Sequence, residues 1–80
     1  MADSIESEVI AAILRTQPEL DPSQVTPEAA FEDLGMNSLD ALALVNELEE
    51  GFNIFIPNEE AMGMRTVGEA IESIRRLAAP

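Results

Sequence analysis

The segment GMNSLDAL, residues 35–42, places one serine directly before a stretch with helical periodicity. Serine is among the best helix N-cap residues, because its hydroxyl accepts a hydrogen bond from an early backbone N–H and stabilises the helix by about 1 kcal/mol over alanine. The same hydroxyl can carry a phosphate ester, which the positive end of a helix dipole favours. Ser38 is therefore a candidate N-cap and also a candidate site of covalent attachment.

The composition argues against most catalytic chemistry. The 80-residue chain contains no Cys, His, Trp or Tyr, which removes thiol nucleophiles, disulfides, imidazole bases and the usual zinc ligands. The 16 acidic residues leave a carboxylate-based hydrolase or a calcium protein as an alternative. However, no D-x-D-x-D-G loop of the EF-hand type is present, and nothing places two carboxylates in a cleft. We therefore predict no catalytic residue and no metal site.

The charge of the chain indicates protein partners. Sixteen acidic residues face four arginines and no lysine, which gives a formal net charge of -12. This charge disfavours contact with nucleic acid and with anionic membranes, and it speeds encounter with basic protein surfaces. It also opposes the compact state by self-repulsion, so added salt should stabilise the fold. The apolar stretches are shorter than the ~20 residues of a membrane span, and the N-terminal MADSIESE lacks a signal segment. We expect a cytoplasmic protein without membrane insertion.

Two segments precede Ser38. A first helix should run from Asp3 or Ser4 to about Arg15, with Glu6 three residues after Asp3 in a capping-box arrangement. A long connection then follows to about Asn37, and residues 26–34, TPEAAFEDL, are expected to form a short helical turn with Pro27 at its first position. The apolar residues of the first helix are Ile5, Val9, Ile10, Ile13 and Leu14, and those of the connection are Val25, Phe31 and Leu34.

Three further elements follow Ser38. A second helix should end at Gly51, and FNIFIP should be an extended connector from which Phe55 points outward. A short helix should run from about Pro57 to Gly63, and Thr66 with Glu69 should cap a last helix. The predicted inner faces are Leu39, Leu42, Val45 and Leu48 in the second helix and Val67, Ala70, Ile71, Ile74 and Leu77 in the last; Met36, Met62 and Met64 are expected to fill gaps in the core.

These elements predict an all-α fold. Three longer helices and one short helix would form a small bundle around one aliphatic core, with a long first loop and shorter later connections. The expected domain organisation is a single small domain covering residues 1–80.

At residues 31–61 the sequence FEDLGMNSLDALALVNELEEGFNIFIPNEEA resembles the signature region of the acyl carrier proteins. The similar features are the F-x-D-L-G opening, the D-S-L core (here N-S-L), the acidic second helix ending in L-E-E-x-F and the I-P-x-E-E start of the third helix. The resemblance extends from about Ile5 to Leu77. It implies that Ser38, flanked by Asn37 and Leu39, receives 4'-phosphopantetheine from coenzyme A through a phosphopantetheinyl transferase. The terminal thiol of this arm would carry acyl groups as thioesters, which also accounts for the absence of cysteine.

The resemblance further implies a docking surface for acyl-loading and acyl-processing enzymes with basic patches. An ordinary solvated acidic face is the alternative interpretation, but steering toward basic partners favours docking. We expect the protein to act as a monomer. The residues assigned to this surface are Asp40, Leu42, Glu47, Glu49, Glu50, Glu59 and Glu60.

Three residues depart from the family pattern. Asn37 stands where most of the family has Asp, Ala43 where carriers of fatty-acid synthesis usually have Glu, and Asn46 where they usually have an apolar residue. Drift on a solvated helix is one explanation; a carrier of a specialised, polyketide-type pathway is the one we favour. A fatty-acid-synthesis carrier and an aminoacyl or peptidyl carrier remain alternatives, the latter less favoured because two glycines do not precede the signature pair. Outside this class, an acidic interaction module without a cofactor remains open.

Overall fold

The computed structural model of the chain describes residues 4–78. The elements in chain order are helix α1 (Ser4–Thr16), the 3-10 helix η1 (Pro22–Gln24), and helices α2 (Ser38–Phe52), α3 (Asn58–Gly63) and α4 (Val67–Leu77). Residues 4–78 contain no strand, although Ala30 and Thr66 form an isolated antiparallel bridge. The predicted all-α class, with three longer helices, one short helix and a long first loop, is confirmed.

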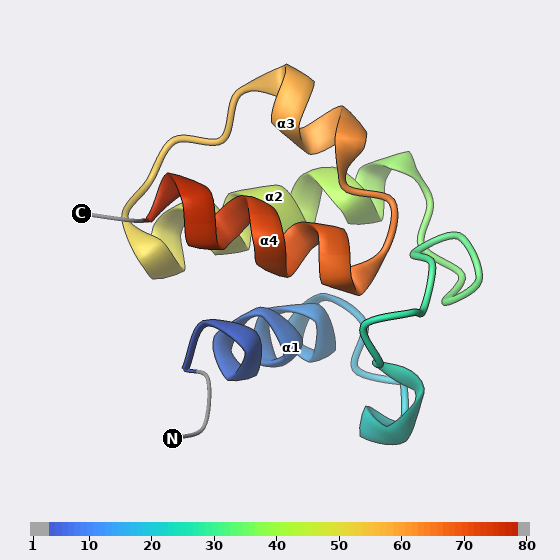
Figure 1. Cartoon of the computed structure of the whole chain (residues 1–80). Helices are drawn as coiled ribbons and strands as arrows, with labels where there is room; N and C mark the ends of the chain where they lie inside the picture. The colour runs from blue at the N-terminus through green and yellow to red at the C-terminus, as the bar shows by residue number, and fades with distance from the viewer. Residues whose placement is uncertain (1–3, 79–80) are drawn as a thin grey trace.

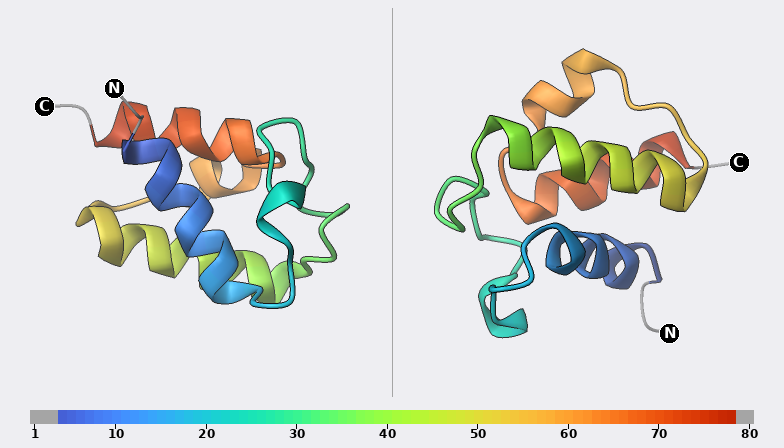
Figure 2. Two further views of the ribbon diagram at one scale, coloured as in Figure 1. Left: turned by 90° about the horizontal axis from the view of Figure 1, so that it is seen from below. Right: turned by 180° about the vertical axis from the view of Figure 1, so that it is seen from behind.

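Helices α2 and α4 overlap in the view of Figure 1 but are separated when the molecule is seen from below (Figure 2, left). Helix α1 packs against both of them from one side, and α3 lies on the opposite side of the pair (Figures 1 and 2). This arrangement makes α3 the outer neighbour of α2. The start of α2, where Ser38 lies, is thus next to the end of the bundle where the long connection arrives.

The aliphatic core is built mainly by α1, α2 and α4. Helix α3 has no buried residue and contributes the half-buried Ala61. Helix α3 therefore packs at the edge of the core and does not pass through it. The buried hydrophobic residues are Val9, Ala12, Ile13, Val25, Phe31, Met36, Leu44, Leu48, Ile56, Met64, Val67, Ala70, Ile71 and Ile74.

Two predicted helices agree closely with the structure. Helix α1 ends at Thr16, one residue beyond the expected Arg15. The predicted cap residue Asp3 lies outside the described residues. Helix α4 has the predicted capping box: the Thr66 side chain accepts a hydrogen bond from the Glu69 N–H at 3.1 Å, and Glu69 Oε1 accepts one from the Thr66 N–H at 3.0 Å. Its predicted inner face is buried, apart from the half-buried Leu77.

The prediction for the second helix was wrong at its end and on part of its inner face. The helix ends at Phe52, not Gly51, because Asn53 adopts the left-handed conformation (φ 56°) and its N–H bonds the Glu49 carbonyl. Leu39 and Leu42 are 75% and 64% exposed. The buried stripe instead runs through residues four apart, Leu44, Leu48 and the half-buried Phe52, with Val45 beside it.

TPEAAFEDL forms turns and not a helix: the Ala29 N–H donates to the Thr26 carbonyl at 3.0 Å around Pro27, and the Leu34 N–H donates to the Ala30 carbonyl at 3.1 Å. The same segment also bonds to the chain at the start of α4: Phe31 N–H donates to the Arg65 carbonyl at 2.9 Å, and Val67 N–H donates to the Ala29 carbonyl at 3.0 Å. These long-range bonds interrupt the local ones, so the turns do not continue into a helix. The helical turn of the connection lies earlier, in η1, where Asp21 and Gln24 form a capping box.

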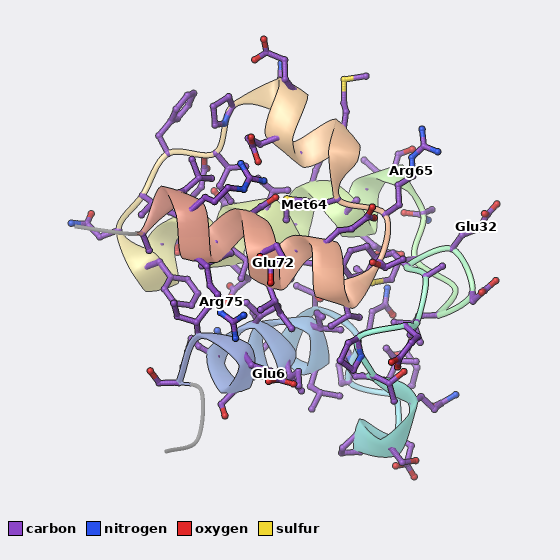
Figure 3. The ribbon with its side chains drawn as sticks, in the orientation of Figure 1. Glu6, Glu32, Met64, Arg65, Glu72 and Arg75 are labelled. Carbon is purple, nitrogen blue, oxygen red and sulfur yellow. The ribbon has the colours of Figure 1, made fainter. Side chains whose placement is uncertain are left out.

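The predicted connector FNIFIP begins later than expected: Phe52 is the last residue of α2, and residues 54–57 link α2 to α3 without helix or strand. Ile56 is 4% exposed whereas Phe55 is 75% exposed, so the expected alternation is confirmed. Met36 and Met64 fill the core as expected, and Figure 3 shows Met64 inside the bundle below α3. Met62 is 76% exposed, so its assignment to the core was wrong.

Candidate functional site

Ser38 is the first residue of α2, and it is exposed. The N-cap is the preceding residue: Asn37 Oδ1 accepts a hydrogen bond from the Asp40 N–H at 2.9 Å, and Asp40 Oδ2 accepts one from the Asn37 N–H at 3.1 Å. The prediction that Ser38 is the N-cap was therefore wrong by one residue, because the extended backbone of Asn37 already supplies the cap. The Ser38 hydroxyl makes no hydrogen bond within residues 4–78, so it is free to react.

The chain before Ser38 is fixed by a turn and a buried anchor. Gly35 has φ +80°, a conformation that glycine adopts without steric cost. Met36 is 8% exposed, and its N–H donates to the Phe31 carbonyl at 3.1 Å. Because Met36 is anchored in the core and Asn37 caps the helix, the backbone of Ser38 is held in place while its side chain faces solvent.

The start of α2 suits a negatively charged group. The amides of Ser38 and Leu39 have no hydrogen-bond acceptor in the described part of the chain. Free N–H groups and the helix dipole together favour an anion at this end of a helix. The Asp40 carboxylate opposes such an anion, but one of its oxygens is engaged with the Asn37 N–H. An exposed hydroxyl beside free amides fits a phosphodiester.

A groove of about 400 Å³ adjoins Ser38. It lies between α2 and α3 and is mostly apolar; we call it the first groove, and its lining residues are Ser38, Ala41, Leu42, Val45, Asn58, Ala61 and Met62. A deeper cavity of about 20 Å³ shares Ala41, Val45 and Ala61 with it. That volume is close to the size of one water molecule, so the core as it stands has no room for a long chain.

Four of the predicted docking acids are engaged inside the molecule. Asp40 belongs to the capping box. Glu47 accepts a hydrogen bond from Arg15 Nε at 2.9 Å, and this bond raises the pKa of Arg15. Glu49 accepts one from the Ile56 N–H at 2.8 Å, which ties the connector to α2. The fourth is Glu60.

Glu60 forms a two-point ion pair with Arg76 of α4. Both of its carboxylate oxygens accept hydrogen bonds from the guanidinium at 3.0 Å. These hydrogen bonds hold the pKa of Glu60 below its ordinary value. The pair joins α3 to α4 across 16 residues of sequence, a distance at which no local spacing rule could have indicated it. By contrast, Glu50 and Glu59 are exposed and make no ion pair or hydrogen bond within residues 4–78.

The arginines lie outside the first groove. Figure 3 shows Arg75 on α4 near Glu72, with which it pairs at 3.3 Å, on the side toward Glu6 of α1. Arg65 projects from the segment between α3 and α4 (Figure 3). The surface between α2 and α3 is therefore acidic and apolar, and none of the described basic side chains lines the groove.

The described residues offer neither a cluster of metal ligands nor a helix suited to a membrane. Among residues 4–78, no group of three or more acidic side chains is arranged to hold a metal ion. None of the helices described is both long enough and apolar enough to span a membrane.

Comparison with known proteins identifies the family. Residues 8–74 match the family described as "Phosphopantetheine attachment site". The chain is 47% identical over 68 residues to an acyl carrier protein of Helicobacter pylori, covering 84% of this chain and 87% of the relative. It is 42% identical over 73 residues to an acyl carrier protein of Thermosynechococcus vestitus, covering 90% of each. These matches confirm the predicted resemblance. The chain therefore belongs to the acyl carrier proteins of the phosphopantetheine-attachment family, non-catalytic carriers whose cofactor is a covalently bound 4'-phosphopantetheine.

Proposed function

We propose that Ser38 is the attachment residue and that the chain carries acyl groups on its arm. The observation that carries this proposal is the exposed, unbonded Ser38 hydroxyl at the start of α2, beside the first groove. In loading, this oxygen attacks the pantetheine-bearing phosphorus of coenzyme A, and the adenosine bisphosphate portion leaves. The bound arm supplies a thiol that holds the acyl group as a thioester. Asn37 and Met36 hold the backbone of Ser38, and the free amides of α2 stabilise the phosphate.

Loading with coenzyme A and a broad-specificity phosphopantetheinyl transferase tests the attachment residue. Intact mass should rise by one phosphopantetheine group, and fragmentation should place the group on Ser38. Ser38→Ala should abolish the gain. Ser7→Ala, which removes an exposed serine of α1, should load normally. No mass gain in the native chain would favour the acidic interaction module without a cofactor.

We further propose that α2 and α3 form the docking surface for the transferase and for acyl-processing enzymes with basic patches. The net charge of -12 supports steering toward such patches. The contacts described above separate the seven assigned residues into those with internal partners and those without. Glu50 and Glu59 can meet a partner without losing an internal contact, and the exposed Leu42 can add apolar contact. Asp40, Glu47, Glu49 and Glu60 would share their oxygens with internal donors.

Charge reversal tests this surface most cleanly at the two acids without internal contacts. Glu50→Lys combined with Glu59→Lys should weaken binding to the transferase at low salt while leaving the fold intact. Glu19→Lys combined with Glu28→Lys changes the net charge equally at two exposed positions of the connection between α1 and α2, outside the proposed docking surface. Equal weakening by both pairs would mean that net charge acts without a defined surface.

The pathway is the finer part of the proposal. We propose a specialised, polyketide-type pathway, with the protein working as a cytoplasmic monomer. The supporting residues are Asn37, Ala43 and Asn46, all exposed on or next to α2. The two relatives are described only as acyl carrier proteins, so the support for a particular pathway comes from these three side chains. If they select partners, the loaded chain should be a poor substrate for a fatty-acid ketosynthase, and Ala43→Glu with Asn46→Leu should improve it. Efficient turnover of the native chain would favour fatty-acid synthesis.

A further inference from the structure

Among residues 4–78, four large apolar side chains are exposed, and three of them lie along two adjoining grooves. Leu39, Leu42, Phe55 and Met62 are each at least 64% exposed. Leu42 and Met62 line the first groove. Leu42 and Phe55 line a second groove of about 700 Å³, whose other lining residues are Val45, Asn46, Glu49, Ile56, Pro57, Asn58 and Glu59. Exposed apolar residues that cluster in this way mark a contact surface, whereas single scattered ones do not.

The second groove adjoins the first and shares Leu42, Val45 and Asn58 with it, but it extends away from the proposed attachment residue. Its α2 residues extend toward Glu49, whereas Ser38 lines only the first groove. Asn46 is eight positions after Ser38, or roughly 12 Å along the helix axis at 1.5 Å per residue. The loading chemistry proposed above needs the first groove and leaves the second without a role.

The backbone forces Phe55 to stay exposed. Ile56 is buried, and its N–H donates to the Glu49 carboxylate at 2.8 Å. Side chains alternate along an extended segment, so Phe55 faces solvent when its neighbour Ile56 enters the core. Because the ring is attached to a fixed connector, this chain loses little backbone conformational entropy when a partner binds the ring. Aromatic side chains in this situation are frequent hot spots of protein interfaces.

The charges around the second groove identify the chemistry of its occupant. Glu49 and Glu59 stand on its rim, and none of the described arginines lines it. A second copy of this chain would bring acidic residues against acidic residues, and an anionic lipid surface would be repelled by the net charge of -12. The complementary occupant is a protein segment with a large apolar side chain flanked by arginine or lysine.

We propose that the second groove and Phe55 form an anchor site for such a segment of a partner enzyme and distinguish among basic partners. The inference rests on the proposed docking function. The acidic residues attract basic surfaces in general. Phe55 strengthens binding only of those partners that place an apolar side chain against it.

Two helical peptides provide the probe. Both carry the same four arginines on one face, and one has a central phenylalanine where the other has alanine. Titrated into the ¹⁵N-labelled full chain at low salt, the phenylalanine peptide should bind about fivefold or more tightly than the alanine peptide. It should also shift the amide signals of Asn46, Phe55 and Ile56. Phe55→Ser should remove the difference between the peptides, and Phe55→Leu should retain most of it. Met62→Ser removes an equally exposed side chain from the first groove only, so the difference should persist.

The proposal would be overturned by equal binding of the two peptides, by a preference that survives Phe55→Ser, or by unfolding of that variant. Sedimentation showing Phe55-dependent self-association, or Phe55-dependent binding to anionic vesicles, would also overturn it in favour of those occupants. Loading of native chain and Phe55→Ser by the transferase separates this proposal from the docking and carrier functions. Normal loading without peptide discrimination removes only the anchor site, whereas failure to load removes the carrier assignment of Ser38 and leaves the peptide result standing.

Discussion

At the start of α2 the exposed serine hydroxyl and the helix cap belong to neighbouring residues. Asn37 makes the capping hydrogen bond, and the Ser38 side chain makes none within the described residues. The position next to the proposed attachment residue therefore stabilises the helix and leaves the serine side chain unconstrained. An amide and a carboxylate can both act as N-cap acceptors, so the replacement of the family's usual Asp by Asn37 keeps the cap and removes one negative charge.

This division of roles predicts that two alanine substitutions change stability by different amounts. Asn37→Ala should lower the free energy of unfolding by about 1 kcal/mol through loss of the cap. Ser38→Ala should change it by less than about 0.5 kcal/mol, because an exposed side chain without hydrogen bonds is lost. Urea denaturation of both variants measures the difference. Asn37→Asp is the control that retains a cap, and its stability should stay close to that of the native chain. A larger loss for Ser38→Ala than for Asn37→Ala would contradict this assignment.

The end of α2 depends on the left-handed backbone of Asn53. Asparagine tolerates this conformation better than most residues, and glycine adopts it freely. Asn53→Ala should therefore cost about 1 kcal/mol, whereas Asn53→Gly should be close to neutral. Thermal denaturation of the two variants is the measurement. Similar melting temperatures for both would show that the conformation of residue 53 does not limit stability.

At the scale of elements, helix positions were predicted most accurately from the sequence where several local signals agree. The Thr66–Glu69 box located α4, and the Pro57 and Gly63 positions located α3. Leu39 and Leu42 were wrongly assigned to the inner face of α2, because exposed leucines at helical spacing have the same sequence pattern as a core face. The prediction for TPEAAFEDL was wrong for a different reason: part of its backbone bonds to residues 65, 67 and 68, which a local rule cannot include, and only turns remain between these bonds. Ser38 was proposed from its motif, but both grooves needed the packing of α3 beside α2.

Helix α3 is held by few contacts, so its ion pair matters to its position. It has no buried residue, and its N-cap Pro57 makes no side-chain capping bond. The Glu60–Arg76 pair ties its outer side to α4, while Asn58, Ala61 and Met62 form one wall of the first groove. A basic partner that competes for Glu60 should therefore loosen the helix that borders the proposed attachment site.

The ion pair predicts the titration of Glu60. Because Arg76 lowers the pKa of Glu60 in the folded state, the pair's contribution to stability is complete above the unfolded pKa of a glutamate, about 4.3. It is lost as the pH falls through the lower folded value. The carboxyl carbon of Glu60, followed by NMR, should titrate below the ordinary range in the native chain. Arg76→Gln should raise the midpoint, whereas Arg75→Gln should leave it in place. An unchanged midpoint in Arg76→Gln would show that the pair is not formed in solution.

At the scale of the whole molecule, the net negative charge destabilises the folded state and favours the proposed encounters with basic partners. The chain carries a formal charge of -12 within extents of 33 × 31 × 20 Å. At about 0.01 M salt the screening length is about 30 Å, so nearly every carboxylate repels every other across the molecule. At about 0.15 M it falls to about 8 Å, and repulsion is confined to neighbours.

Added salt should therefore raise the melting temperature of the chain between about 0.01 M and 0.15 M NaCl, because screening relieves repulsion in the compact state more than in the expanded one. Calorimetry at neutral pH measures this shift. The same salt should weaken binding to the transferase, since steering depends on unscreened charge. MgCl₂ at matched ionic strength separates screening from specific cation binding: the two salts should give similar shifts if screening dominates. A melting temperature that falls with NaCl would show that the ion pairs Arg15–Glu47 and Arg76–Glu60 outweigh the repulsion among the remaining acids.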